Sequence, residues 1–124
     1  MRIAILCLMM LTSYEVGAHE MTPTYPTLER SYVKGVYKTT LQIFNKRKDV
    51  EYYEIGVFDK KFNPIPFVTS YKVIYLKYLG HMTFDVFIRE KDKHRAFYVC
   101  SRSKLRIQNI TKAAISSRIC SKFK

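Results

Sequence analysis

The chain has 124 residues, of which 48% are hydrophobic and 15% aromatic, and a formal net charge of +12. This length leaves room for one hydrophobic core, and the apolar content is too high for a disordered chain. We therefore expect one strongly basic globular domain. Its charge attracts phospholipid, polysaccharide, nucleic acid or acidic protein surfaces alike, and does not choose among them.

Residues 1–18 have the pattern of a secretory signal peptide. Arg2 precedes an apolar run from Ile3 to Thr12, and small residues follow up to Ala18. The run is about ten residues long, half of what a membrane-spanning helix needs. We expect cleavage near Ala18, which leaves His19 as the first residue of a periplasmic or secreted domain, residues 19–124. The alternative is a buried N-terminal strand.

Short apolar stretches separated by turn-forming residues predict an all-β sandwich or barrel. Pro23 and Pro26 place the first strand at a sheet edge, because proline cannot donate to a strand ladder. The clearest alternation lies between Met82 and Arg89, where every second residue is apolar. The expected strands are Met21–Leu28, Val36–Phe44, Val50–Asp59, Val73–Tyr78, Met82–Arg89 and Ala96–Ser103.

Two segments break this pattern. Pro64–Phe67 contains two prolines and is expected to be extended but outside a central ladder. Glu90–Arg95 is almost entirely charged and is expected to be a solvated loop.

Cys100 and Cys120 remain after removal of the leader, and an even pair in an exported chain predicts a disulfide. Two buried thiols are the alternative. If the two residues face each other on antiparallel neighbours, the bond clips a hairpin whose last strand is Ser116–Phe123. For the region between them, residues 106–118, the sequence is compatible with a loop and with a short helix that Thr111 would cap.

No motif for catalysis, cofactor binding or metal binding is present, so we expect a non-enzymatic protein without a cofactor. The three histidines fall at the mature N-terminus, in a turn and in a charged loop, and His19 is expected to be a frayed end. Asn109 begins a glycosylation sequon, which matters only in a eukaryotic secretory pathway.

Basic side chains alternate with aromatic ones in several segments, and alternation places such a row on one face of a strand. One interpretation of this pattern is an anion-binding face with tyrosine platforms. The alternative is an ordinary exposed strand surface, which contains Lys and Tyr in any case. The candidate anion-binding residues are Lys72, Lys77, Arg102, Lys104, Arg106, Arg118 and Lys122.

Four segments in this order suggest a family: Thr39–Asn45, Tyr53–Asp59, Pro64–Phe67 and the strand that ends in Arg89. Over about residues 21–105 the chain resembles the N-terminal immunoglobulin-like domain of periplasmic pilus-assembly chaperones. The resemblance implies an immunoglobulin-like antiparallel β-sandwich of about seven strands. That family has a second domain, and its basic anchors lie between the two domains, so no anchor residue is carried over to this chain.

The resemblance also implies exposed edge strands that can accept a strand from a partner. We therefore expect an exported chaperone- or adaptor-like module that pairs through a sheet edge with another exported protein. The alternative is a basic envelope protein that docks on anionic lipid or polysaccharide. Nucleic acid is not favoured as a partner, and the oligomeric state stays open.

Overall fold

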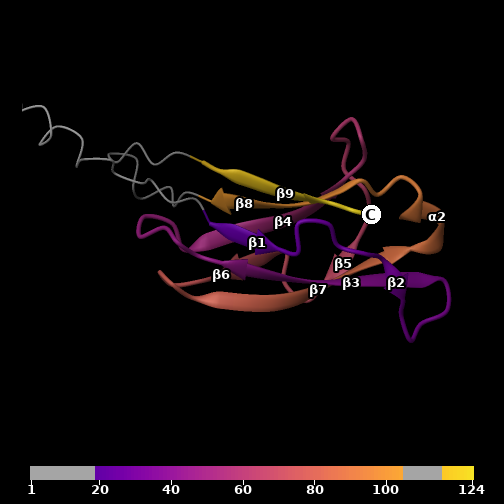
Figure 1. Cartoon of the computed structure of the whole chain (residues 1–124), viewed down its shortest axis with the longest axis horizontal. Coiled ribbons are helices and arrows are strands. Elements are labelled where there is room, and N and C mark those ends of the chain that lie inside the picture. The colour runs from indigo at the N-terminus through magenta and orange to yellow at the C-terminus, as the bar shows by residue number, and fades with distance from the viewer. Residues whose placement is uncertain (1–18, 105–115) are drawn as a thin grey trace, which may run out of the picture.

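The computed structural model describes residues 19–104 and 116–124, which form two antiparallel sheets packed face to face (Figure 1). The all-β sandwich prediction is confirmed. The predicted signal peptide, the capped helix at Thr111, Arg106 and Asn109 lie outside the described residues. The described strands are β1 (Glu20–Thr22), β2 (Glu29–Arg30), β3 (Val36–Phe44), β4 (Tyr52–Phe58), β5 (Val68–Thr69), β6 (Val73–Tyr75), β7 (His81–Arg89), β8 (Tyr98–Lys104) and β9 (Arg118–Lys122).

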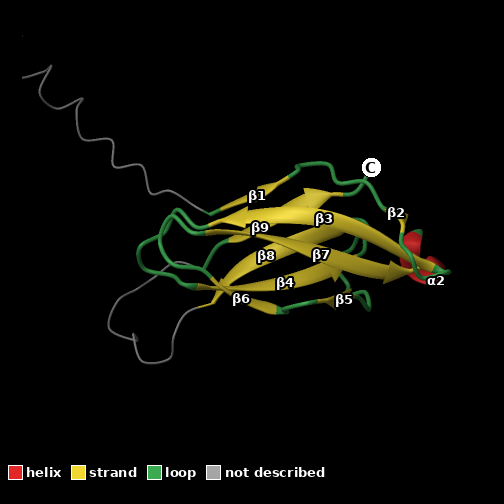
Figure 2. Ribbon diagram, turned by 90° about the horizontal axis from the view of Figure 1, so that it is seen from below, coloured by secondary structure: helices red, strands yellow, loops and turns green. Residues whose placement is uncertain are grey.

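The first sheet has the order β1-β3-β7-β5, with β2 also paired to β3, and the second has the order β6-β4-β8-β9. Strand β3 pairs with β7 along its whole length, from Val36 opposite Arg89 to Phe44 opposite His81. Strands β5 and β6 follow each other in the sequence but belong to different sheets. Figure 2 shows both along one side of the sandwich, with β1 on the other.

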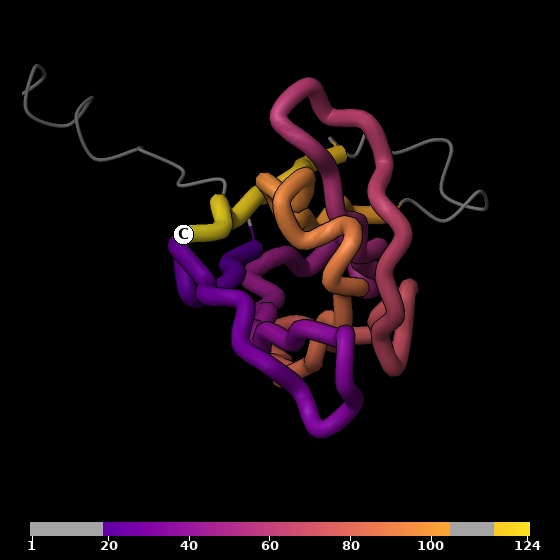
Figure 3. Tube along the Cα trace, turned by 90° about the vertical axis from the view of Figure 1, so that its right-hand side faces the viewer, coloured from indigo at the N-terminus to yellow at the C-terminus, as the bar shows by residue number. Residues whose placement is uncertain are grey.

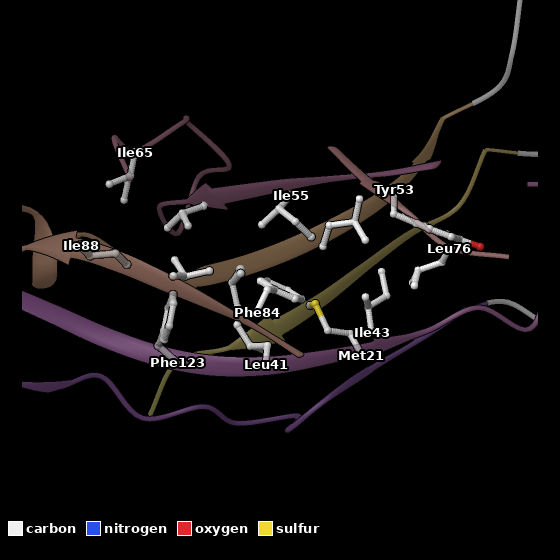
Figure 4. Close-up of a cluster of buried hydrophobic side chains, with 14 of the residues drawn as sticks. Met21, Leu41, Ile43, Tyr53, Ile55, Ile65, Leu76, Phe84, Ile88 and Phe123 are labelled. Atoms are coloured by element: carbon white, nitrogen blue, oxygen red, sulfur yellow. The ribbon is translucent and has the colours of Figure 1, made fainter. Parts of the chain in front are cut away.

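The core lies between the sheets and is built by alternation (Figure 4). In β4 the side chains of Tyr53, Ile55 and Val57 are buried, whereas their neighbours are partly exposed. Strand β7 buries Phe84, Val86 and Ile88 in the same way, as the sequence predicted. Burial of these side chains supplies the main favourable free energy of folding.

The sequence prediction was wrong about the first strand. Within Met21–Leu28 only Met21 and Thr22 belong to a strand, β1, and a connection that begins with the cis peptide bond between Thr22 and Pro23 leads to β2, which begins at Glu29. The edge position is as predicted, but the strand is shorter because the prolines exclude the segment after Thr22 from the ladder. The expected strand Val73–Tyr78 is likewise shorter and ends at Tyr75, and β5 was not foreseen.

The segment Glu90–Arg95 is also more ordered than the predicted solvated loop. It contains the four-residue helix α2 (Glu90–Lys93), in which the Asp92 side chain is buried between Arg89 and Arg95. Hydrogen bonding to Arg95 lowers the pKa of Asp92. All of its residues except Asp92 are exposed, as predicted, but two ion pairs hold the segment as an ordered turn.

Within the described residues no helix is long and apolar enough to cross a membrane.

The predicted hairpin is present. Cys100 of β8 lies directly opposite Cys120 of β9, and a disulfide joins them. Because β9 is an edge strand that pairs with β8 alone among the described strands, the covalent bond fixes the register of the last strand.

Replacing both cysteines by alanine should lower the free energy of unfolding by about 3 kcal/mol, because the bond closes a loop of 20 residues and restricts the unfolded chain. Urea unfolding of C100A/C120A and of the wild type measures the loss. Reductant should shift the midpoint of the wild type and leave that of the double variant unchanged. An equal midpoint for the wild type with and without reductant would contradict a closed disulfide.

Candidate functional site

Strand β6 forms one edge of the second sheet and is bonded on one side only among the described strands. The carbonyl of Lys72 accepts a hydrogen bond from β4 at 2.8 Å. The N–H of Leu76 donates at 2.7 Å to the residue that directly precedes β4. Alternate residues of an antiparallel strand bond to the same neighbour. The backbone groups of Val73 and Tyr75 therefore point away from the sheet, where a further strand could pair with them.

Apolar side chains are exposed along this edge. Val73 is 46% exposed and Tyr75 is 45% exposed, and the Tyr75 ring lies 5.3 Å from that of Tyr52 on β4. Edge strands of monomers are usually protected from pairing, and an uncovered apolar edge marks a place for interaction. The exposed large apolar residues on and around this edge are Val68, Tyr71, Val73, Tyr75, Tyr78 and Leu79.

The opposite edge of the same sheet is partly covered. The N–H groups of Lys122 and Lys124 donate to the carbonyls of Thr24 and Pro26, at 3.1 and 3.0 Å. The segment between β1 and β2 thus occupies the outer side of the C-terminal half of β9. Of the two edges of this sheet, β6 is the one that the described residues leave open along its whole length.

Asn45 positions β6 relative to the first sheet. Its side chain is fully buried, and its amide nitrogen donates to the carbonyls of Val50 and Leu76 at 2.8 and 2.9 Å. Its amide oxygen accepts from the backbone N–H of Arg47 and the hydroxyl of Tyr53. Burial raises the pKa of Tyr53 to about 12, so this hydroxyl remains a donor. All four hydrogen bonds of the amide are therefore used, and one of them fixes the end of β6.

Four of the predicted anion-binding residues project from one face of the second sheet. Arg102 and Lys104 both contact Glu54, at 3.5 and 2.5 Å, and hydrogen bonding to Lys104 lowers the pKa of Glu54. Arg118 lies 5.4 Å from the centre of the Phe58 ring, and Lys122 lies 4.8 Å from that of Phe97. The face is thus a mixture of paired and aromatic-stacked cations.

The other candidate cations are elsewhere. Lys72 and Lys77 flank β6 at the open edge, and the ammonium of Lys72 lies 5.8 Å from the centre of the Phe67 ring. The structure does not bring these two lysines into one row with the four on β8 and β9. Binding of an anion by any of these residues stays a prediction.

His19 is not the frayed end that the sequence suggested, since its side chain is only 1% exposed. Its Nε2 lies 2.8 Å from Ser101 Oγ, and its Nδ1 lies 3.2 Å from Ser117 Oγ. The imidazole also lies 4.5 Å from the ring of Tyr53. Burial lowers the pKa of His19 from 6.5 to about 4, so the ring is neutral at neutral pH.

The guanidinium of Arg47 continues this polar cluster. It binds Asp49 through two nitrogens, at 2.9 and 2.6 Å, and reaches the hydroxyls of Ser103 and Ser117 at 3.4 Å. Sequence reasoning missed the cluster. The sequence contained a signal for buried polar groups: Ser101 and Ser103 occupy positions of a strand that, by its period of two, face the core.

Comparisons with known proteins show which structures this chain is similar to. No protein-family model and no curated protein matches the sequence. Among solved structures, the chain is similar to the E. coli chaperone DraB, with a TM-score of 0.61 and 14% identity over 86% of this chain and 53% of that one. It is similar to the periplasmic chaperone SfaE, with a TM-score of 0.53 and 15% identity over 86% and 56%.

A third similar structure is the PapD-like domain 7 of human CEP192, with a TM-score of 0.53 and 9% identity over 85% of this chain and 81% of that one. The chain has a PapD-like fold. The resemblance to the pilus chaperones is thereby confirmed as a likeness of fold. The chain spans about half of the length of the two chaperones.

Replacing Asn45 by alanine should destabilise the PapD-like fold by about 3 kcal/mol or more, because buried carbonyls and a buried hydroxyl lose their partners. Urea unfolding measures the loss. Hydrogen exchange should also show faster exchange at Leu76, whose segment the amide holds. The control is Gln42→Ala, at an exposed position of β3, the strand that Asn45 directly follows, and an equal effect of the two substitutions would contradict this role of Asn45.

The buried His19 should make stability depend on pH. Between about pH 6.5 and pH 4 the unfolded chain binds a proton at this residue and the folded chain does not, so stability falls as the pH is lowered. The loss should approach about 3 kcal/mol and end below pH 4. Unfolding midpoints of the wild type and of His19→Asn across this range measure it. The control His94→Asn, at an exposed position, should retain the full slope; an unchanged slope in His19→Asn would show that other groups cause it.

Proposed function

We propose that this chain is an exported, non-enzymatic binding module that pairs through the edge of β6 with an extended segment of another exported protein. The outward backbone groups of Val73 and Tyr75, set among exposed apolar side chains, are the observation that carries this proposal. A partner strand would gain main-chain hydrogen bonds there, and its alternate side chains would pack on the exposed rings.

The fold supports this proposal. Two of the similar structures are chaperones, one of them periplasmic, and we infer that this chain acts as a chaperone or adaptor in the same general sense. The predicted leader of residues 1–18 and the Cys100–Cys120 disulfide both fit a periplasmic or secreted location. Neither the leader nor its cleavage near Ala18 is needed for the geometry of the edge.

The edge can be blocked without harm to the sheet. The N–H of Val73 points away from β4, so Val73→Pro removes a donor that only a partner would use. The matched control Val73→Thr keeps the N–H, the branched shape and the propensity for strands. If a partner strand pairs with β6, proline should weaken binding at least about tenfold, because one hydrogen bond to the partner and the ladder beyond it are lost.

The experiment captures proteins from the envelope fraction of cells that produce the chain, on immobilised wild-type protein at low and high salt. A strand partner should remain bound at high salt, because edge pairing does not depend on exposed charges. The dissociation constant of the retained protein is then measured for the wild type, Val73→Pro and Val73→Thr. Equal binding by both variants, or retention of nothing but anionic lipid or polysaccharide at low salt, would refute the proposal.

A further inference from the structure

The hairpin between β2 and β3 carries a preorganised tip. The N–H of Ser31 donates to the carbonyl of Val36 at 3.0 Å, and the N–H of Val36 donates to the carbonyl of Val33 at 3.2 Å. The hydroxyl of Ser31 both donates to the carbonyl of Val33 and accepts from its N–H. Gly35 closes the turn at a φ of 79°, which glycine adopts without strain. The conformation of the tip is therefore fixed before any ligand arrives.

Two apolar side chains stand free at this tip. Tyr32 is 104% exposed, the highest value among the exposed large apolar residues, and Val33 is 63% exposed. Figure 3, which faces this end of the sandwich, shows the hairpin projecting from the body of the molecule. Packing within the domain does not account for an ordered turn that presents a tyrosine and a valine to the solvent.

Cations surround the tip. Helix α2 lies beside it, because the N–H of Glu90 donates to the carbonyl of Gly35 at 2.8 Å. Segments 29–35 and 89–95 together contain six Lys and Arg residues and three Asp and Glu residues. Asp92 is already neutralised by two arginines. Lys34 and Lys91 are exposed, and no ion pair with a described carboxylate engages them.

We propose that this end of the molecule, defined as the tip Ser31–Gly35 together with α2, docks on an anionic phospholipid bilayer. The Tyr32 ring and Val33 enter the interfacial region, where tyrosine is favoured, and Lys34 and Lys91 contact the phosphates. A convex tip with two apolar side chains suits insertion into lipid, whereas a stable protein interface buries roughly 800 Å² on each partner. The inference does not rest on the proposed function.

The docked orientation leaves the open edge accessible. Figures 1 and 2 both place β6 toward the end of the sandwich opposite to β2 and α2. A molecule held by its tip would thus present β6 away from the bilayer, where a protein partner could reach it. Failure of lipid docking and failure of strand pairing are separable, because they concern residues at opposite ends.

The chain has no tryptophan, so the fluorescence of one introduced tryptophan reports on one place in the structure. Tyr32→Trp should show a blue-shifted emission with vesicles of phosphatidylcholine and phosphatidylglycerol, and brominated lipid should quench it. Vesicles of phosphatidylcholine alone should give little shift. The matched reporter is Tyr25→Trp, which replaces a 59% exposed tyrosine outside the tip and should keep its emission unchanged.

Sedimentation with the same vesicles tests the two components of docking. The double variant Tyr32→Ser with Val33→Ser should lower the partition coefficient about tenfold, through loss of apolar burial. Lys34→Glu with Lys91→Glu should lower it at least about tenfold. The control pair Lys72→Glu with Lys77→Glu changes the net charge equally at the far end and should have a smaller effect.

Three outcomes would overturn the proposal. The first is an unshifted emission of Tyr32→Trp while the protein sediments with anionic vesicles, which would place docking elsewhere. The second is an equal loss of binding from both pairs of charge reversals, which would make net charge the cause. The third is a shift that appears without vesicles as the protein concentration rises, which would assign the tip to a second copy of the chain.

Discussion

The fully hydrogen-bonded amide of Asn45 is the constraint on which both the packing of the sheets and the open edge depend. Asn45 directly follows β3 of the first sheet, and its side chain bonds to Leu76, which directly follows β6 of the second. An amide with four partners is specific in a way that apolar packing is not, because a shift of either sheet would leave buried groups unpaired. Strand β6 has three residues and one neighbour, too few for stability alone, so a contact beyond its own ladder is what keeps it in place.

The two edges of the second sheet differ in the segments that lie beside them. The β9 edge is bonded by the segment around Pro26 and joined to β8 by a disulfide. Among the described residues, β6 is held by its ladder to β4, by the buried Ile74 and by the hydrogen bond from Asn45 to Leu76. Pairing of a further strand with β6 would therefore stabilise the least supported strand of the sheet. This asymmetry favours β6 as the binding edge over β9, whose outer backbone groups are partly used already.

Much of the fold followed from alternation, and the exceptions have physical causes. The period of two in Met82–Arg89 predicted β7 almost to its ends, and the spacing of Cys100 and Cys120 predicted the last hairpin. Strands of two residues, such as β5, are too short to show any period. His19 and Arg47 were missed because their burial depends on serines from distant strands. A polar residue with a remote partner carries no local sign of its environment.

The site was foreseen less well than the fold, for a related reason. The resemblance predicted exposed edges, but only the hydrogen-bond pattern shows which residues face outward and which edge another segment covers. Similarly, composition predicted a basic surface but not which of its cations are engaged by carboxylates. Arg102 and Lys104 share Glu54, and Arg89 and Arg95 share Asp92. Net charge therefore does not say which cations are engaged within the domain, whereas the structure places Lys34 directly after the exposed Tyr32 and Val33 at the tip.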